Sequence, residues 1–393
     1  MPQFGRAMLA EWLLDPDFTY LNHGTVGAPP TRVLKKQQAL RDEIERLPSR
    51  FMLRELAGEH PAPWRSESRL REAAAPVAAF LGSRPDDLVF VPNVTTGTNA
   101  VLRSVALESG DEVVISDLAY GAVTLAAAVV TRERHATLRT IEVPHPVRSR
   151  DAVVQAFASA LTPRTRLVIV DHITAQTALV MPVAEIAAVC RPLGIPVLVD
   201  GAHAPGSLAV NIPALGVDYY SANLHKWAHA PRACGILWAT VDRQQTLRHP
   251  VVSWGSGKGF LREFEWNATS DPTACLSAPE GIALLQEWGF EAVLAYMHGL
   301  AWEAADLLTT RWETTLETPR EMVGALVTVP LPERAGTTED EAKRLRLSLL
   351  VNDRIEVHLH AWRGRLWTRV SAQVYNDRSD IERLADAVLR KPG

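Results

Sequence analysis

The chain has 393 residues, of which 47% are hydrophobic and 22% are charged, and a formal net charge of −4; these proportions indicate a globular protein that can bury a sizeable core and hold more than one domain. The small negative charge and the lack of a basic cluster argue against a general nucleic-acid binder, and no apolar run is long enough to span a bilayer. The three cysteines lie far apart, which indicates neither a disulfide framework nor a zinc site, and the N-terminus lacks the pattern of a signal peptide, so we expect a cytoplasmic protein.

The first part of the chain predicts an arm followed by two helices. Residues 1–30 end in YLNHGTVGAPP, whose glycines and prolines disfavour regular structure, so we expect an irregular arm. A helical pattern begins at Thr31 and is closed by Pro48, and a second helix, rich in Ala and Arg, covers about 64–80.

From about residue 87, strand and helix signals alternate along the chain. The expected strands are DLVFV (87–91), EVVISD (112–117), TLRTIEV (137–143), RLVIVDHI (166–173) and PVLVDGAH (196–203). The runs VIVD and VLVD are apolar on both faces, as buried parallel strands are. This alternation predicts a mostly parallel sheet with crossover helices, in which ligands gather at the carboxyl ends of the strands.

The pattern changes after about residue 275, where a long helical region is followed by three short strands and a last helix. Such a mixture is typical of a smaller α+β unit. We therefore divide the chain into an N-terminal arm (1–30), a large domain (31–275) and a small C-terminal domain (276–393).

The most informative stretch runs from Pro196 to Ala239. It places Asp200 at the end of an apolar strand and Lys226 in a short polar segment before the next strand. Each residue alone has an ordinary explanation, since Asp can cap a helix and Lys can be a surface charge. Lysine is scarce, however, with six residues against many arginines, which favours an amine that must deprotonate.

A second segment predicts a site for a phosphate. In VFVPNVTTGTNAVL, an Asn-Val-Thr-Thr-Gly turn precedes a helix, so backbone N–H groups, a hydroxyl and the helix dipole can meet a dianion. A turn with an ordinary N-cap would have the same pattern, so this segment carries weight only together with the first.

The motifs DGAHAPG and SANLHKW, taken with the phosphate segment, resemble the class V aminotransferase family, close to its isopenicillin N epimerase-like group. The resemblance covers nearly the whole chain and implies the fold of type I pyridoxal 5′-phosphate (PLP) enzymes: a mostly parallel seven-stranded sheet in a large domain, with a smaller α+β domain. It also implies that Lys226 forms the Schiff base with PLP and that Asp200 keeps the pyridine nitrogen protonated.

The resemblance assigns further roles residue by residue. It places the phosphate at Val94, Thr95 and Thr96, and at Asn223 and His225, where the family more often has Ser in place of Asn223. Tyr120 would stack on the ring and assist catalysis, and His203 would contact the phenolic oxygen.

Two later motifs concern the partner subunit and the substrate. WNATSDPTACLSAP resembles a segment in which a Thr, here Thr269, reaches the phosphate of the neighbouring subunit, which implies a homodimer with shared active sites. RLWTRVSAQVYN makes Arg369 the expected clamp for the carboxylate of a small amino-acid substrate, because a guanidinium pairs with a carboxylate through two bonds. The arm, through Asn22 and His23, contributes to this substrate site, and Arg262 and Trp254 are weaker candidates.

The sequence leaves the reaction open. No cysteine lies between Asp340 and Tyr375, where a desulfurase of this family would carry its nucleophile, so desulfurase activity is disfavoured. Epimerisation or racemisation at Cα is the first hypothesis; transamination and C–S lyase chemistry by β-elimination are the alternatives, and a PLP-fold protein without catalysis is least expected. An epimerase needs a second proton donor on the opposite face, for which Tyr120, His172 and His23 are candidates.

Overall fold

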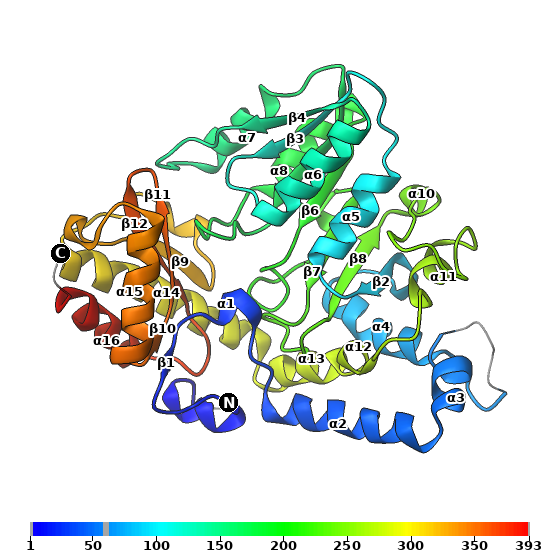
Figure 1. Ribbon diagram of the computed structural model, residues 1–393, viewed down its shortest axis with the longest axis horizontal. Coiled ribbons are helices and arrows are strands. Elements are labelled where there is room, and N and C mark those ends of the chain that lie inside the picture. Colours follow the sequence, from blue (N-terminus) through cyan, green and yellow to red (C-terminus); the bar gives the residue numbers. More distant parts are fainter. Residues whose placement is uncertain (1–2, 58–62, 392–393) are drawn as a thin grey trace.

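A computed structural model gives the structure of residues 3–57 and 63–391. Seven strands form one large sheet in the order β2-β8-β7-β6-β5-β3-β4, in which only β8 runs antiparallel to its neighbours (Figure 1). The mostly parallel seven-stranded sheet is therefore confirmed. The strands are β2 (Leu88–Val91), β3 (Glu112–Ser116), β4 (Thr137–Ile141), β5 (Thr165–Asp171), β6 (Val197–Asp200), β7 (Tyr219–Asn223) and β8 (Gly235–Ala239).

The central strands are apolar on both faces because helices cover both sides of this sheet. Val168 and Val170 of β5 belong to one core cluster, whereas Leu167 and Ile169 of the same strand belong to another. The first cluster includes residues of α4, α7 and α8, and the second includes residues of α5 and α6. This double coverage is the arrangement that the continuous apolar runs predict.

Helices alternate with the parallel strands along the chain, as expected for crossover connections. In the first two-thirds of the chain they are α2 (Thr31–Arg46), α3 (Pro48–Arg50), α4 (Arg69–Phe80), α5 (Val94–Ser104), α6 (Gly121–Glu133), α7 (Arg150–Ala158), α8 (Val183–Cys190), α9 (Ile212–Leu215), α10 (Val241–Gln244) and α11 (Phe260–Glu265). After these come α12 (Thr273–Leu276), α13 (Ala278–Glu287), α14 (Phe290–Trp312), α15 (Glu339–Asn352) and α16 (Arg378–Leu389). No helix within the described ranges is long and apolar enough to cross a membrane.

A second sheet of three antiparallel strands lies in the C-terminal part of the chain, in the order β11-β12-β9. Its strands are β9 (Leu326–Pro330), β11 (His358–Trp362) and β12 (Arg365–Ser371). One face is apolar and packs on α14, α15 and α16 through residues such as Leu359 and Val370. The opposite face meets the large domain, because the Thr328 hydroxyl donates to the Gln176 carbonyl, 2.7 Å away, in the loop after β5.

The N-terminal arm has more regular structure than we predicted. It contains a 3₁₀-helix (Arg6–Glu11), β1 (Thr19–Tyr20) and α1 (His23–Val26). Strand β1 pairs in parallel with β10 (Ile355–Glu356), so the arm is bound to the small domain, as Figure 1 shows. The prediction was wrong here because the partner strand lies at the far end of the chain, where local sequence patterns carry no trace of it.

The division at residue 275 stays a prediction, since α13 packs on α2 and α4 of the large domain while α14 contacts β9 and α16 of the small one.

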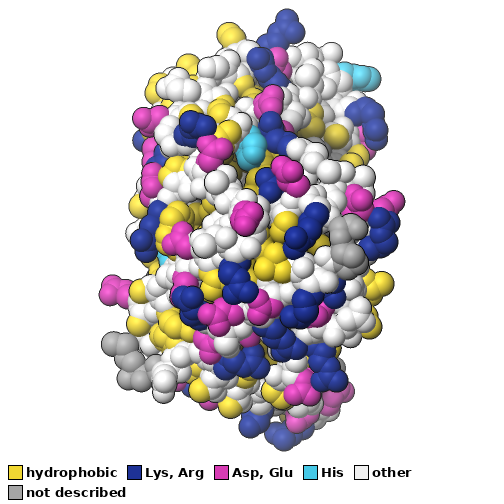
Figure 2. Space-filling view, turned by 90° about the vertical axis from the view of Figure 1, so that its left-hand side faces the viewer, with side chains coloured by type: hydrophobic (Ala, Val, Ile, Leu, Met, Phe, Trp, Pro, Cys, Tyr) yellow, Lys and Arg dark blue, Asp and Glu magenta, His cyan; other side chains and the backbone are white. Residues whose placement is uncertain are grey.

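On the face of the molecule shown in Figure 2, basic and acidic side chains are interspersed rather than gathered by sign. Nothing on that face favours a polyanionic partner.

Candidate active site

The predicted acid and amine meet at the carboxyl edge of the large sheet. Asp200 is the last residue of β6, and Lys226 lies in the connection between β7 and β8. The Lys226 amine lies 3.2 Å from Nε2 of His203, three residues beyond Asp200. The structure therefore brings together three of the residues selected from the sequence.

Asp200 carries an unused acceptor atom. Its side chain is 2% exposed; Oδ1 accepts the backbone N–H of Ala202 at 2.9 Å, whereas Oδ2 is buried without a partner among the described residues. Burial raises the pKa of Asp200, and the Ala202 N–H and the Lys226 charge act against that rise. A buried carboxylate oxygen without a partner is costly, so this atom fits a protonated ring nitrogen.

Lys226 is held as a reactive amine. Burial lowers its pKa to about 7, the nearby Arg369 guanidinium adds to the shift, and Asp200 opposes it. The amine is therefore neutral near pH 7 far more often than the amine of an exposed lysine, and a neutral amine is the form that attacks a carbonyl.

The backbone around Lys226 is fixed by the N-terminal arm. Burial lowers the pKa of His23 to about 4, so the ring is neutral: Nε2 donates to the Lys226 carbonyl at 3.0 Å, and Nδ1 accepts from the Tyr375 hydroxyl at 2.9 Å. Gly27 has a φ of +69°, and a Cβ there would lie 1.9 Å from the His225 carbonyl oxygen. The arm thus sets the lysine segment in place, although His23 itself has no free nitrogen.

The predicted phosphate site is the N-terminus of α5. The Asn93 side chain accepts from the Thr96 N–H at 2.9 Å, and Asn223, at the end of β7, accepts from the Val94 N–H at 3.0 Å. Neither contact uses the N–H of Thr95. Asn223 therefore ties the helix start to the strand that leads to Lys226, and the positive end of the helix dipole faces the same edge of the sheet.

His225 reaches the same region in its neutral form. Its Nδ1 donates to the Cys234 carbonyl at 2.8 Å, and burial lowers its pKa to about 4. Nε2 of the neutral ring then carries a lone pair, so donation to a phosphate would require a second proton. A neighbouring dianion favours that protonation.

Asp171 is a site residue that our sequence analysis missed. It ends β5 beside Asp200 in register, so both carboxyl groups lie on one face of the sheet. Burial and the Asp200 charge raise the pKa of Asp171 well above its ordinary value, and burial also raises the pKa of Asp200, so the two carboxyl groups together hold a proton more readily than separate ones would. The run VIVD before Asp171 resembles the run VLVD before Asp200, and this pattern could have identified it.

Arg369 lies on β12 and faces the site as a cation without an anion. Its side chain is 3% exposed, Nη2 donates to the Thr25 hydroxyl at 2.8 Å, and Nη1 donates to the Ala175 carbonyl. Its Nε has no partner, and no described carboxylate lies within ion-pair distance. Burial lowers the pKa of Arg369 to about 10. A substrate carboxylate would relieve this unpaired charge.

The remaining predicted site residues are not shown in contact with Lys226 or Asp200. Asn22 lies beside the clamp and donates to Glu356 at 2.8 Å, while Tyr120 follows β3 at the same edge with a side chain that is 49% exposed. Thr269 is exposed and Trp254 is 78% exposed, so the role of Thr269 at a partner subunit and that of Trp254 at the substrate site stay predictions. Arg262 lies on α11.

His172 and His23 were candidates for a second proton donor; both ring nitrogens of His23 are engaged, whereas His172 uses only Nδ1 in a hydrogen bond. Nδ1 of His172 is 2.8 Å from the Tyr220 hydroxyl, deep in the core. Burial lowers the pKa of His172 to about 4. Of the three candidates, Tyr120 is the one that is not buried, with 49% of its surface exposed.

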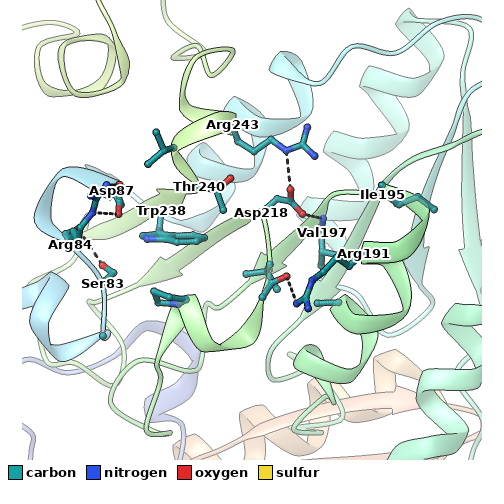
Figure 3. Close-up of a pocket in the computed structure, with 17 residues that line it drawn as sticks. Ser83, Arg84, Asp87, Arg191, Ile195, Val197, Asp218, Trp238, Thr240 and Arg243 are labelled. Carbon is teal, nitrogen blue, oxygen red and sulfur yellow. Dashed lines mark hydrogen bonds and ion pairs between the residues drawn. The ribbon is translucent and has the colours of Figure 1, made fainter.

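A cavity of about 940 Å³ lies at the opposite edge of the sheet, where β6 and β7 begin (Figure 3). Arg243 pairs with Asp218 at 2.9 Å, and Arg84 pairs with Asp87 at the same distance. Arg243 and Arg84 are thus neutralised by carboxylates, whereas Arg191, which also lines this cavity, donates to the Gly216 carbonyl at 3.4 Å.

Comparison with known proteins places these features in a family. Residues 29–384 match the family model described as aminotransferase class-V. Isopenicillin N epimerase of Streptomyces clavuligerus is 33% identical over 394 residues, which cover 96% of this chain and 95% of the relative. A probable chloroplastic L-cysteine desulfhydrase of Arabidopsis thaliana is 30% identical over 403 residues, which cover 95% of this chain and 83% of the relative.

Solved structures share the fold. A mutant of the protein C-DES, with glycine covalently linked to its PLP cofactor, superposes with a TM-score of 0.78 at 23% identity and full coverage of both chains. Cysteine desulfurase CsdA of Escherichia coli superposes with a TM-score of 0.76 at 19% identity, covering 98% of each chain. The expected fold of type I PLP enzymes is confirmed.

Proposed function

The chain belongs to the class V aminotransferase family, whose members use PLP, and on that premise we propose that it is a lyase that removes the Cα proton of an amino acid and releases a leaving group from Cβ. The observation that carries this proposal is the Lys226 amine at the carboxyl edge of the sheet, oriented by His203, whereas both ring nitrogens of His23 and Nδ1 of His172 are engaged in other hydrogen bonds.

The residues at this edge fit the cofactor. Lys226 would hold its aldehyde carbon, Asp200 would use its unpaired Oδ2 for the ring nitrogen, and the N-terminus of α5 would bind its phosphate. When bound, PLP supplies an electron-withdrawing ring that stabilises the charge left on Cα after a proton is lost.

Lys226 acts as the base through its neutral amine. Nε2 of His203 lies 3.2 Å away, and burial lowers the pKa of His203 well below its ordinary value. The neutral ring accepts a hydrogen bond from the amine and orients it without competing for the proton. Such a positioned base contributes about 10²–10⁴-fold to the rate.

Arg369 sets the orientation of the substrate. A carboxylate bound to its guanidinium brings the amino acid to the face of β12 that meets the arm, within the field of Lys226. Orientation of this kind decides which bond at Cα faces the base.

β-Elimination needs one base, since the leaving group departs after the proton is removed, whereas epimerisation also needs a donor on the opposite face. The desulfhydrase relatives support elimination. Epimerisation is the second candidate, because the epimerase relatives are 32–33% identical and the half-exposed Tyr120 follows β3 at the same edge of the sheet. Desulfurase activity is not proposed, because the chain lacks a cysteine between Asp340 and Tyr375.

We also propose that two copies of the chain form a homodimer with shared sites, in which the exposed Thr269 reaches the phosphate of the neighbouring subunit. Sedimentation of the purified protein tests this. The cytoplasmic location expected from the sequence stays a prediction.

The test of the reaction is incubation of the PLP-loaded protein with L-cysteine and other L-amino acids in heavy water, with Lys226→Ala as control. Pyruvate with ammonia and sulfide supports the lyase. Deuterium at Cα together with loss of chirality would indicate epimerisation instead of elimination. A keto acid without a released thiol would indicate transamination.

A further inference from the structure

Strand β11 carries two histidines that the proposed mechanism does not use. His358 and His360 lie with their rings stacked, 5.3 Å between centroids and 29° between planes, and His360 is 2% exposed. In the antiparallel register, His358 lies directly opposite Arg369 of β12. The pair is therefore adjacent to the predicted carboxylate clamp.

The alternation of side chains places these groups on one face of the small sheet. Leu359, between the two histidines, is buried in the helix-covered core, so His358 and His360 face the other way, as Arg369 does. That face meets the large domain, because Arg369 contacts the Ala175 carbonyl and Thr328 contacts the loop after β5. The histidines thus lie at the substrate end of the site.

Several polar atoms on this face are buried without a hydrogen-bond partner in the described structure. They are Nε2 of His358, Nδ1 and Nε2 of His360, and Nε of Arg369. Buried polar groups are usually paired, so an unpaired group on this face points to a polar ligand. The number of free atoms favours a ligand with more than one acceptor group.

The charge on this face favours an anion. Burial lowers the pKa of His358 to about 3 and that of His360 to about 4, and the Arg369 charge is the next cause in both cases. Arg346 also acts on His358, whereas Glu339 acts in the opposite sense on His360. Each ring is thus neutral and offers one N–H donor beside an arginine that no described carboxylate neutralises.

We propose that this face selects an amino acid whose side chain ends in a carboxylate or a similar acid group: Arg369 binds the α-carboxylate, and His358 and His360 donate to the acid of the side chain. The inference rests on the proposed function, since it requires the α-carboxylate at Arg369. It adds a substrate class that the family relationship does not give.

The experiment compares L-aspartate with L-asparagine and L-glutamate with L-glutamine on the PLP-loaded protein. Binding is measured by the change in visible absorbance, and Cα exchange in heavy water is measured by NMR. Whichever of L-aspartate and L-glutamate binds better should have a dissociation constant at least about tenfold lower than that of its own amide. His358→Leu and His360→Leu should each remove most of that preference and leave the binding of the amide within about twofold.

Two further variants keep the test sharp. His358→Asn retains an N–H donor and should recover part of the preference, even if a leucine variant folds poorly. His135→Asn, at an exposed position with a positive φ that Asn tolerates, is the matched control and should change neither ligand.

Equal binding of acid and amide by the wild-type protein would overturn the inference, as would histidine variants that weaken both ligands alike. Failure of the proposed function has a different signature. In that case no amino acid, neutral or acidic, exchanges its Cα proton, although the absorbance change still reports which ligands bind.

Discussion

The two edges of the large sheet both carry charged side chains, but they treat those charges differently. At the edge where β6 and β7 begin, Arg243 and Arg84 each have a carboxylate partner around a cavity of about 940 Å³. At the edge where β5 and β6 end, Asp200 has a buried oxygen without a partner, and Lys226 has a pKa of about 7.

This difference favours the edge where β5 and β6 end as the site, because its buried groups need a partner that the described residues do not supply. Ion pairs at a partly exposed surface contribute little to the free energy of unfolding, and their charges need no ligand. A buried carboxylate oxygen without a hydrogen-bond partner and a buried guanidinium without a carboxylate are costly, so Asp200 and Arg369 indicate a molecule that completes them. Trp238, whose indole N–H is also unpaired, is an exception at the opposite edge.

The largest contrast between the edges should come from their cations. Lys226→Ala removes the base and should lower turnover of amino acids by about 10²–10⁴-fold. Arg243→Ala, at the opposite edge, should leave turnover within about twofold, because its ion pair is partly exposed. Steady-state kinetics on both variants, with circular dichroism to verify folding, measures the contrast; equal losses would contradict it.

A second contrast concerns arginines. Arg369→Lys replaces a planar fork by a point charge and leaves part of a buried site unsatisfied, so we expect KM to rise by about 30-fold or more with a smaller change in kcat. Arg84→Lys is the matched change at the opposite edge of the sheet, and we expect this variant to keep the wild-type KM. A fall in kcat at constant KM would show that Arg369 does not bind the substrate.

A third contrast concerns the backbone under Lys226. Gly27→Ala adds a Cβ 1.9 Å from the His225 carbonyl oxygen at a positive φ, so we expect the free energy of unfolding to fall by about 3 kcal/mol or more. Gly194→Ala has a similar φ of +66° but open space around it, and should cost about 1–2 kcal/mol. Urea unfolding of the two variants separates the clash from the strain; equal costs would contradict the close approach of the arm.

The amine of Lys226 should impose a pH dependence on cofactor capture. Because its pKa is lowered to about 7, the amine is protonated below pH 7 and neutral above it. The rate at which cofactor-free protein takes up PLP should therefore rise about tenfold per pH unit up to pH 7 and then level off. Stopped-flow absorbance measures this rate, and a rise that continues to pH 10 would show an ordinary lysine.

The smallest effect should be the stability of the opposite edge. Arg243→Ala breaks a partly exposed pair with Asp218, and we expect the free energy of unfolding to change by no more than about 1 kcal/mol. A much larger loss would mean that the paired charges of this cavity support the sheet. Thermal unfolding of the variant decides between these outcomes.

The large sheet and its catalytic edge could be predicted from the sequence because both depend on local patterns. Apolar runs define buried strands, and the ends of parallel strands gather their side chains, so the pattern alone predicts Asp200 at the edge that Lys226 shares. The same reasoning should have selected Asp171, which ends the neighbouring strand.

The remaining features depend on contacts between distant segments. The hydrogen bonds of His23 to Tyr375 and to the Lys226 carbonyl join three parts of the chain, and no local pattern encodes them. The pairing of β1 with β10 is equally remote. Arg369 could be chosen from its motif, but its unpaired Nε and its neighbour His358 depend on how the small sheet folds.

The most direct test of the central claim is to map the residue that holds the cofactor. The PLP-loaded protein is reduced with borohydride, digested, and analysed by mass spectrometry, with Lys226→Ala treated in parallel. We predict a single phosphopyridoxyl adduct on the peptide that contains Lys226, and none in the variant. An adduct on another lysine in the wild-type protein, or an adduct that persists in Lys226→Ala, would contradict the account.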